Sequence, residues 1–477
     1  MRPVVGFDLD LTLVDSADGI IATFLETAHR LGVDVAAGAV RELIGVPLED
    51  TCAQLLGAEA ATEAARLYRE LYPELGVPRT VLLPGAAEAV AAVRALGGRA
   101  VVVSAKAEHL IHATLEYVGL TVDDVVGNRF GPAKGEALRE LRASVHVGDH
   151  PGDMIGAKVA GAHAVGVPTG SHDAAALRRA GADTVLHSLE SFAPWLDEHV
   201  LDARLVELER ALRDLDSVVV AFSGGADSAF LLAAAARALG TDRVLAATAV
   251  SPSLPRRELI AAREFAEGLG VRHVRPRTDE MSREGYRANS GDRCYFCKAE
   301  LVDVLLPLAE REGFAHLATG TNADDAVAGF RPGIKAAAER GAATPLRDAG
   351  LTKAQIREAS RRWGLPTWDK PAAACLSSRV AYGLEITPAR LARVDRAEAT
   401  LRAELATGGV PVRNLRVRDL GHTARIEVDA DVVDRVSQLA GALDAVRSAG
   451  FDAVEVDPRG FRSGSMNELL TESSLFS

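Results

Sequence analysis

The chain has 477 residues, of which 48% are hydrophobic and 25% charged, and its formal net charge is −12. This length exceeds what one hydrophobic core usually supports, so two or three domains are expected. The acidic balance argues against a general nucleic-acid or membrane-surface binder, although local arginines can still hold small anions. No apolar run approaches the roughly 18 residues of a membrane span, and Asp8 and Asp10 interrupt any cleavable signal. We therefore expect a cytoplasmic protein without membrane or nucleic-acid partners.

Strands and helices alternate over the first part of the chain, from residue 1 to about 195. This alternation predicts a parallel sheet with helices on both faces. A mostly helical stretch is expected soon after the first strand, and the residues around Pro194 and Trp195 are expected to end the unit. The expected strands here are residues 3–10, 99–105 and 143–149.

A second series of strands and helices follows. A helix over residues 202–215 leads into a strand at 217–222, and the pattern continues to about residue 380. The remainder mixes a long helix with short strands, which predicts a smaller α+β part. We therefore expect an α/β protein whose main boundary lies near residue 200 and whose domains are 1–198, 199–385 and 386–477.

Asp8 and Asp10 stand two apart at the end of the first apolar strand. Their spacing puts both carboxylates on one side, at the sheet edge where α/β proteins bind ligands. An ordinary strand-to-loop cap would explain this pair taken alone. Further polar residues close or follow the later strands in order, so all can converge on one crevice: Thr12, Ser104, Lys134, Asp149 and Asp153.

Together these residues resemble the four motifs of the haloacid dehalogenase (HAD) superfamily of phosphohydrolases, across the whole first unit. The resemblance implies a Rossmann-like domain in which Asp8 is the nucleophile that forms an aspartyl-phosphate and Asp10 is the general acid/base. Ser104 and Lys134 would hold the phosphoryl oxygens. The helical insert, about residues 16–82, would be a cap that selects the substrate. Magnesium would be held by Asp8, the Asp10 carbonyl, Asp149 and Asp153.

A glycine-rich turn, Ser223–Ser228, lies between the strand at 217–222 and a helix. Such a turn presents backbone N–H groups and the positive helix end to an anion. A lone SGG would be weak evidence, because glycine turns are common. SGGxDS in this setting resembles the PP-loop of ATP pyrophosphatases, which cleave ATP to AMP and pyrophosphate. The resemblance implies an ATP site in which Asp227 binds magnesium or orients phosphates, formed by Ser223, Gly224, Gly225, Asp227, Ser228, Gly320 and Thr321.

Further motifs bear on the substrate of this second half. They are RCYFCK from residue 293, GTNADD from 320, RPG from 331 and KPAAACLSSR from 370. The series resembles the LarE family of sulfur transferases, which make the nickel-pincer nucleotide cofactor, across residues 202–477. The resemblance implies adenylation of a carboxylate of pyridinium-3,5-biscarboxylic acid mononucleotide and its replacement by a thiocarboxylate. It also implies small nucleotide substrates and a homo-oligomer with substrate contacts across subunits.

Three arginines, Arg416, Arg418 and Arg462, match positions that bind the substrate's phosphate in this family. Arg416 and Arg418 lie two apart on an expected strand and should face one side. Guanidinium suits a bidentate phosphate contact. The alternative is a solvated charged face. Glu398 also fits the family pattern, with a surface carboxylate on a helix as the alternative.

The four cysteines are too few for a disulfide framework, so the pair Cys294 and Cys297 predicts a metal or redox site. Cys375 matches the LarE family's key cysteine. The resemblance implies either that Cys375 gives up its own sulfur, or that the three cysteines hold a [4Fe-4S] cluster whose open iron binds hydrosulfide. We favour the cluster. A Cys3His zinc site and a redox pair are alternatives, and Cys52 is expected to be a plain buried thiol.

These patterns predict two enzymes in one chain, a magnesium-dependent phosphatase and an ATP-dependent sulfur transferase. Two other functions stay open for the second half. A tRNA thiolase also pairs a PP-loop with cysteines, but the acidic charge and the lack of a recognisable tRNA-binding module count against it. A non-catalytic nucleotide-binding regulator should lack motif residues, and those that can be checked are present. The fusion raises the hypothesis that the phosphatase acts on a metabolite of the same pathway.

Overall fold

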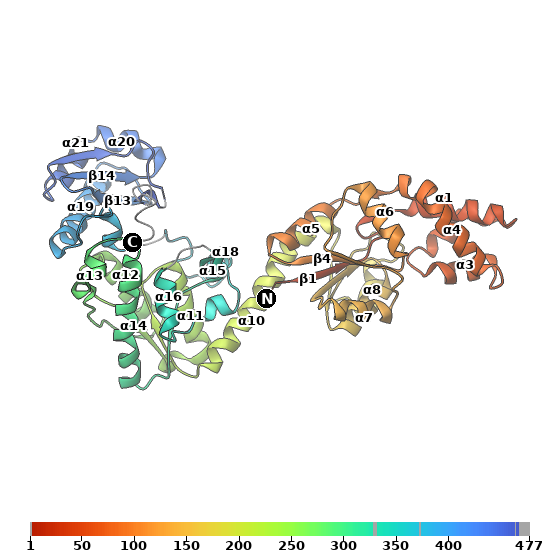
Figure 1. Cartoon of the computed structure of the whole chain (residues 1–477), viewed down its shortest axis with the longest axis horizontal. Coiled ribbons are helices and arrows are strands. Elements are labelled where there is room, and N and C mark those ends of the chain that lie inside the picture. The colour runs from red at the N-terminus through yellow and green to blue at the C-terminus, as the bar shows by residue number, and fades with distance from the viewer. Residues whose placement is uncertain (1, 328–331, 372–373, 463, 467–477) are drawn as a thin grey trace. The chain divides into compact units, whose positions relative to one another are not determined.

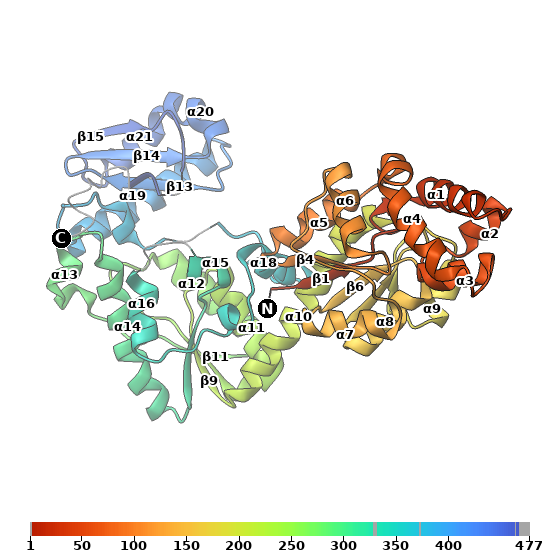
Figure 2. The same cartoon turned by 45° about the vertical axis from the view of Figure 1, so that its right-hand side comes forward.

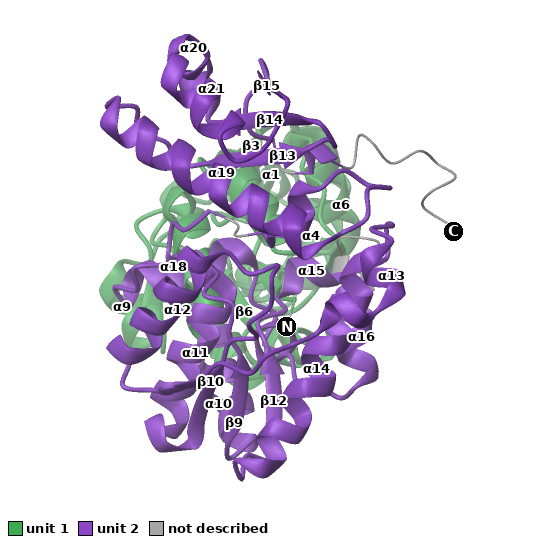
Figure 3. Ribbon diagram, turned by 90° about the vertical axis from the view of Figure 1, so that its left-hand side faces the viewer, with its two compact units in different colours: residues 1–202 green, residues 203–477 purple. Residues whose placement is uncertain are grey.

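The computed structural model describes residues 2–327, 332–371, 374–462 and 464–466 (Figure 1). The chain divides into two compact units, residues 1–202 and 203–477 (Figure 3). The boundary falls inside one continuous helix, α10 (Phe192–Asp214). The residues around Pro194 and Trp195, expected to end the first unit, lie inside this helix, and the helix expected from residue 202 begins at Phe192. Pro194 sits in the first turn of α10, where backbone N–H groups have no partner within the helix and a proline costs little.

The first unit is built on a six-stranded parallel sheet with the order β5-β4-β1-β6-β7-β8. Val5 of β1 pairs with Ala100 on one side and Val145 on the other. The chain thus proceeds outward from β1 in both directions, which opens a crevice at the carboxyl end of β1. The strands are β1 (Val4–Phe7), β4 (Arg99–Val103), β5 (Asp124–Val126), β6 (Val145–Gly148), β7 (His163–Gly166) and β8 (Thr184–Val185).

Valines fill the centre of this sheet, where β-branched side chains suit a strand that is covered on both faces. Val5, Val102, Val145 and Val165 are buried in one cluster with Phe7. The covering helices confirm the α/β expectation: α5 (Ala86–Ala95), α6 (Glu108–Val118), α7 (Pro132–Glu140), α8 (Pro151–Ala160) and α9 (Ala174–Arg179).

A helical cap is inserted after β1. Its entry and exit strands, β2 (Val14–Asp15) and β3 (Val81–Leu82), pair antiparallel, so the insert leaves and rejoins the core at one place. The cap has its own core, in which Phe24, Tyr68, Tyr72 and Cys52 are buried together. Cys52 is thus a buried free thiol, as expected. The cap helices are α1 (Ala17–Arg30), α2 (Ala37–Glu42), α3 (Leu48–Leu56) and α4 (Ala61–Leu75).

The second unit starts with a four-stranded parallel sheet of order β11-β10-β9-β12. Ala221 pairs with both Ala247 and Thr319, so the segments after β9 and β12 leave the same edge side by side. The strands are β9 (Val218–Ala221), β10 (Val244–Ala247), β11 (Arg272–Val274) and β12 (His316–Thr319). The helices include α11 (Ala226–Leu239), α12 (Arg256–Gly268), α13 (Glu284–Arg287), α14 (Arg293–Arg311), α15 (Ala323–Val327), α16 (Pro332–Glu339), α17 (Pro345–Asp348) and α18 (Lys353–Arg362).

A smaller α+β part follows (Figure 2). Its sheet joins β13 (Leu415–Asp419) antiparallel to β14 (Thr423–Val428), which pairs parallel with β15 (Ala453–Val456). The accompanying helices are α19 (Pro388–Thr407), α20 (Val433–Gln438) and α21 (Ala440–Arg447). Leucines and valines of α19 and the sheet share one core. In the described ranges, no helix combines the length and apolar character that crossing a membrane requires.

Candidate active sites

The carboxyl end of β1 carries the first cluster of polar side chains. Lys134, at the start of α7, places its Nζ 2.8 Å from Oδ1 of Asp8 and also pairs with Asp153. All three side chains are buried. Ser104, at the end of the adjacent β4, lines one cavity together with Asp8. The structure therefore brings the expected nucleophile, lysine and serine together.

Three aspartates, Asp8, Asp149 and Asp153, form the one group of metal-ligand type found in the described ranges. Their ligand atoms all lie within 4.8 Å of one another. Burial first, and then the neighbouring carboxylates, raise the pKa of Asp8 and of Asp149. Burial also favours a neutral Asp153, but Lys134 and His146 outweigh it, so the pKa of Asp153 is lowered. A divalent cation would relieve this crowding of carboxylates, so the donor set fits magnesium.

Backbone geometry keeps this triad compact. Thr12 donates its hydroxyl to Oδ1 of Asp149 at 3.0 Å. A Cβ at Gly170 would lie 1.9 Å from Oδ2 of Asp149, and one at Gly148 would collide with Asp153. Both positions therefore require glycine, because any side chain would push an aspartate out of the site.

Asp10 lies beside the triad and is held by two donors. Ser16 donates its hydroxyl to Asp10 Oδ1 at 2.6 Å, and Lys106 donates Nζ to the same oxygen at 2.6 Å. Lys106 also bonds to the Tyr72 hydroxyl at 2.7 Å. Burial alone would lower the pKa of Lys106, but Asp10 and Tyr72 outweigh burial, so the pKa is raised. The sequence interpretation missed Lys106, although its place two residues after Ser104 was a usable signal.

The cap closes over these groups. Asp8, Asp10 and Ser104 line a cavity together with side chains from the cap helices. The cap contribution is mainly apolar and includes Phe24, Val40, Ile44, Leu48 and Tyr68. A substrate phosphate at Asp8 would therefore have its alcohol portion enclosed by the cap.

The second cluster lies where β9 runs into α11. Gly224 has φ +71°, which favours glycine, and the Ser223 and Ser228 hydroxyl oxygens lie 3.1 Å apart. Gly320 follows the adjacent β12, and a Cβ there would lie 2.9 Å from the backbone nitrogen of Ser228. The structure thus brings the two expected glycine segments into contact at the start of a helix, where backbone N–H groups lack partners.

Charged groups surround this loop. Lys370 donates Nζ to the Gly224 carbonyl and to Glu258, both at 2.8 Å. Burial raises the pKa of Asp227, which also lies near Lys353 and Asp325. Lys370 belongs to the KPAAACLSSR motif, so the motif reaches the glycine loop through its first residue. Arg331 of the RPG motif lies outside the described residues.

The three cysteines of the second unit share one neighbourhood. Cys294 and Cys297 lie in the first turn of α14, and Cys375 lies just before the short 3-10 helix Leu376–Arg379. Burial raises the pKa of the Cys297 thiol, and Cys375, Glu280 and Cys294 raise it further. Cys294 is exposed, whereas Cys297 and Cys375 are half-buried. The structure therefore brings Cys375 near the Cys294–Cys297 pair, from which it is separated by 78 or more positions along the chain.

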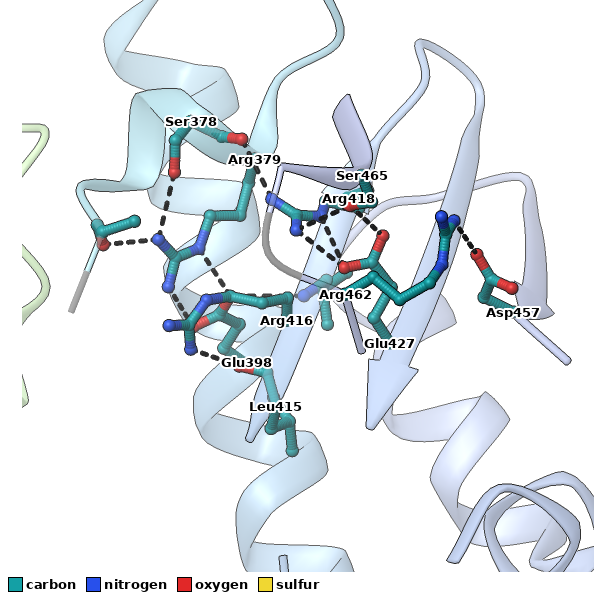
Figure 4. Close-up of polar contacts among 12 residues, drawn as sticks. Ser378, Arg379, Glu398, Leu415, Arg416, Arg418, Glu427, Asp457, Arg462 and Ser465 are labelled. Atoms are coloured by element: carbon teal, nitrogen blue, oxygen red, sulfur yellow. Dashed lines mark hydrogen bonds and ion pairs between the residues drawn. The ribbon is translucent and has the colours of Figure 1, made fainter. Parts of the chain in front are cut away.

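Figure 4 shows a network of buried arginines and glutamates around Arg379 and Arg418, and Arg379 also donates to the Cys375 carbonyl at 2.9 Å. Arg379 is completely buried and donates Nε to Oε1 of Glu398 at 2.9 Å. Arg418 donates Nε and a terminal nitrogen to Oε2 of Glu427 at 3.0 and 2.7 Å. Ser465 bonds to both Arg418, at 3.1 Å, and Glu427, at 2.8 Å. The interpretation of Glu398 as a surface carboxylate is wrong, because α19 turns it into the core.

A cavity adjoins this network. Its lining includes Arg293, Arg416, Arg418, Tyr382 and Phe461. Arg416 and Arg418 are both buried and face this cavity, so a solvated charged face is excluded for them. Burial, and then Arg379, lower the pKa of Arg416 to about 10.

Two further arginines, Arg462 and Arg293, lie near this network. Arg462 pairs with Asp457 at 3.8 Å, and Figure 4 shows it turned toward that carboxylate. Arg293, which the sequence interpretation did not single out as a ligand, lines the cavity and donates to the Ser377 carbonyl at 3.0 Å. Its position directly before Cys294 in the RCYFCK motif was the available signal.

Different known proteins resemble the two parts of the chain. Residues 5–158 match the haloacid dehalogenase-like hydrolase family, and residues 127–192 match the HAD-hydrolase-like family. The probable phosphatase IndB of Dickeya dadantii is 32% identical over 206 residues, which are 39% of this chain and 90% of that protein. The pyridinium-3,5-bisthiocarboxylic acid mononucleotide synthase of Lactiplantibacillus plantarum is 35% identical over 276 residues, which are 58% of this chain and 98% of the synthase.

The chain belongs to the haloacid dehalogenase-like hydrolase family and to the family of the pyridinium-3,5-bisthiocarboxylic acid mononucleotide synthase. An uncharacterized protein of a Synechocystis strain is 41% identical over 276 residues, 57% of this chain and all of that protein. Membership of a hydrolase family and a synthase family identifies the chain as an enzyme, as the sequence predicted. In the hydrolase half, the family and the aspartate triad agree on a magnesium site. The individual roles of the HAD and synthase residues stay predictions.

Proposed function

We propose that the second half of the chain is an ATP-dependent synthase that converts carboxylates of pyridinium-3,5-biscarboxylic acid mononucleotide into thiocarboxylates. The observation that carries this proposal is the 35% identity across 98% of a synthase named for the bisthiocarboxylic product. The glycine loop, the three cysteines and the arginine-lined cavity lie within the matched half. They supply one site each for ATP, sulfur and the substrate's phosphate.

The glycine loop is the proposed ATP site. Backbone N–H groups of Ser223–Ser228 and the start of α11 would bind the pyrophosphate portion. Lys370, fixed to the Gly224 carbonyl at 2.8 Å, adds positive charge at the loop. In the reaction, a substrate carboxylate oxygen attacks the α-phosphorus and pyrophosphate leaves. The resulting acyl-adenylate loses AMP when sulfur attacks the carbonyl carbon, because AMP is a far better leaving group than oxide.

The three cysteines fit a [4Fe-4S] cluster as the sulfur-delivering group. Thiolates are the usual ligands of such clusters, and three of them leave one iron open. When bound, the cluster would supply a position for hydrosulfide. A Cys3His zinc site is the alternative for these thiolates.

The cavity beside Cys375 is the proposed site for the nucleotide's phosphate. Arg416 and Arg418 face it, and Arg293 lines it from the cysteine side. Burial, and then the nearby Arg379, lower the pKa of Arg416 to about 10, so this buried guanidinium lies in a positively charged part of the cavity. A phosphate dianion is a ligand of complementary charge for such a site.

We further propose that the first half is a magnesium-dependent phosphatase. Asp8 would attack phosphorus, with Lys134 and Ser104 holding the phosphoryl oxygens and Asp10 exchanging protons with the leaving alcohol and the attacking water. Bound magnesium, held by Asp8, Asp149, Asp153 and the Asp10 carbonyl, would neutralise charge on the phosphate. The fusion suggests that a phosphorylated nucleotide of the same pathway is a substrate.

Two assays on the full chain test these proposals separately. Release of AMP and pyrophosphate from ATP should depend on the pyridinium dicarboxylate mononucleotide, and ATP cleavage indifferent to it would contradict the synthase proposal. Release of phosphate from a panel of phosphomonoesters, including pathway nucleotides, should require magnesium. Activity on simple esters with none on pathway nucleotides would end the pathway hypothesis while leaving the phosphatase intact.

A further inference from the structure

We propose that Lys106 is a positioning residue for Asp10, which it ties to Tyr72 of the cap so that Asp10 is held ready when the cap is closed. The inference rests on the proposed phosphatase function of the first half. Lys106 is not among the residues proposed to contact the phosphoryl group.

The contacts of Lys106 form a bridge between two parts of the first unit. Lys106 follows β4 of the sheet domain, whereas Tyr72 lies in α4 of the cap. The ammonium group lies 2.6 Å from Asp10 Oδ1 and 2.7 Å from the Tyr72 hydroxyl, and 4.4 Å from the centre of the Tyr72 ring. The Lys106 side chain is only 7% exposed, so these contacts are shielded from water.

The geometry fixes one oxygen of Asp10 and presents the other. Lys106 and Ser16 both donate to Oδ1, each at 2.6 Å. Two donors on one oxygen restrict rotation of the carboxylate, which leaves Oδ2 as the oxygen that exchanges protons in the cavity. Asp10 itself lines that cavity with Asp8. Without Lys106, Ser16 alone would hold the carboxylate, which could then rotate away.

The cap end of the bridge is firmly placed. Tyr72 is completely buried in the cap core, and its ring lies 5.5 Å from that of Tyr68, which lines the cavity. Position 76 has room only for glycine, because a Cβ there would lie 2.4 Å from the Tyr72 ring. A movement of α4 away from the sheet would therefore carry the Tyr72 hydroxyl away from Lys106 and remove one of its two polar anchors.

The step most dependent on Asp10 is hydrolysis of the aspartyl-phosphate. A water oxygen bonds to phosphorus, the bond from phosphorus to the Asp8 oxygen breaks, and Asp8 regains its carboxylate. The proton lost by water passes to Asp10 Oδ2. Formation of the aspartyl-phosphate from p-nitrophenyl phosphate is different, because p-nitrophenolate leaves as an anion and needs no proton. Loss of Lys106 should slow the second step and spare the first.

Kinetics of the full chain with p-nitrophenyl phosphate and magnesium separate these steps. For Lys106→Met we expect kcat to fall by about tenfold or more, which is less than the roughly 10²- to 10⁴-fold of an acid–base group itself, because Ser16 still holds Asp10. The ratio kcat/KM should stay within about threefold, with a burst of p-nitrophenolate before steady state. Lys106→Arg should restore part of kcat, and Tyr72→Phe should show a smaller fall of the same kind. Lys158→Met, which removes an exposed lysine paired with Asp183, is the matched control.

The possible results test the positioning role of Lys106 separately from the phosphatase activity of the first half. If the wild-type chain does not turn over the ester with magnesium, the proposed phosphatase function fails. If it does, equal falls in kcat and kcat/KM for both Lys106→Met and Tyr72→Phe would show a purely structural role. Unchanged kcat in both variants would show no role, and either result overturns the positioning role of Lys106.

Discussion

Arg379 and Glu398 form an ion pair of 2.9 Å in the core of the second unit, where both side chains are buried. The same guanidinium donates to the Cys375 carbonyl at 2.9 Å. The pair thus anchors the backbone of the expected sulfur-transfer cysteine to α19. Removing one member of such a buried ion pair costs free energy, because the remaining charge loses its counter-ion.

Replacing Glu398 by Gln should therefore destabilise the second unit by about 3 kcal/mol or more. Urea unfolding of the full chain, followed by tryptophan fluorescence, measures the change through Trp363 and Trp368 of the second unit, in a background in which Trp195 of the first unit is replaced by Phe. Glu358→Gln is the control, since Glu358 forms a surface pair with Arg361 at 2.8 Å and its loss should cost less than about 1 kcal/mol. Equal destabilisation by the two variants would contradict the anchoring role of Glu398.

Arg418→Lys should weaken binding of the nucleotide substrate while preserving the charge. A lysine cannot reproduce the paired contacts of Arg418 with Glu427 and with a phosphate. We expect KM for the pyridinium mononucleotide to rise by about tenfold, which corresponds to about 1.4 kcal/mol. Arg425→Lys, on the neighbouring strand with an exposed partner Glu455 at 2.6 Å, should leave KM unchanged. A similar KM for the Arg418→Lys and Arg425→Lys variants would show that Arg418 does not bind the substrate's phosphate.

Gly320→Ala should impair ATP binding. The added methyl group would lie 2.9 Å from the Ser228 backbone nitrogen, so the segment after β12 must move away from the glycine loop. Calorimetric titration with ATP and magnesium should show affinity lower by about tenfold or more. Gly268→Ala is the control, because a Cβ there meets nothing within 4 Å and alanine suits the helix. Unchanged affinity in Gly320→Ala would place ATP elsewhere.

Asp8→Asn should lower phosphatase kcat by roughly 10³-fold or more, since an amide oxygen is a poor nucleophile. Phosphate release from p-nitrophenyl phosphate measures this loss. ATP cleavage by the second half should be unaffected in the same preparation, which shows that the chain is folded. Asp18→Asn, on an exposed position of α1, is the matched control. Retention of most activity in Asp8→Asn would exclude the aspartyl-phosphate route.

Cys52 should resist alkylation in the folded chain. Burial, and then Glu49, raise the pKa of its thiol to about 11, so at pH 8 only roughly a thousandth is thiolate. Because the pKa is raised, reactivity should increase as pH approaches 11. Iodoacetamide labelling followed by peptide mass analysis should modify exposed Cys294 first, after chelator treatment, and Cys52 only on unfolding. Equal labelling of both at pH 8 would contradict a buried Cys52.

The sequence was most informative where chemistry and strand ends coincide. Asp8, Ser104 and Asp149 each stand at a strand terminus, and parallel strands necessarily bring such termini to one edge. The glycine loop that starts at Ser223 could also be predicted, because its conformation depends on neighbouring residues in the sequence. These features depend on short stretches of chain, which a single sequence displays directly.

Contacts between distant segments were less accessible. Lys106 reaches Tyr72 of the cap, 34 positions earlier, and no local pattern marks that approach. Glu398 was ambiguous because α19 carries charges on several faces, and only its packing against the sheet decides which face is buried. The continuity of α10 was missed because Pro194 indicates a break unless the helix is known to start at Phe192.

The proposed reaction of the second half replaces a carboxylate oxygen by sulfur. The most direct measurement is mass spectrometry of pyridinium-3,5-biscarboxylic acid mononucleotide after anaerobic incubation with the full chain, ATP, magnesium and sulfide. We expect product masses that correspond to exchange of one and then two oxygens for sulfur, present with wild type and Cys52→Ala and absent with Cys375→Ala. Unchanged substrate mass with wild type, while AMP and pyrophosphate accumulate, would contradict the proposed reaction.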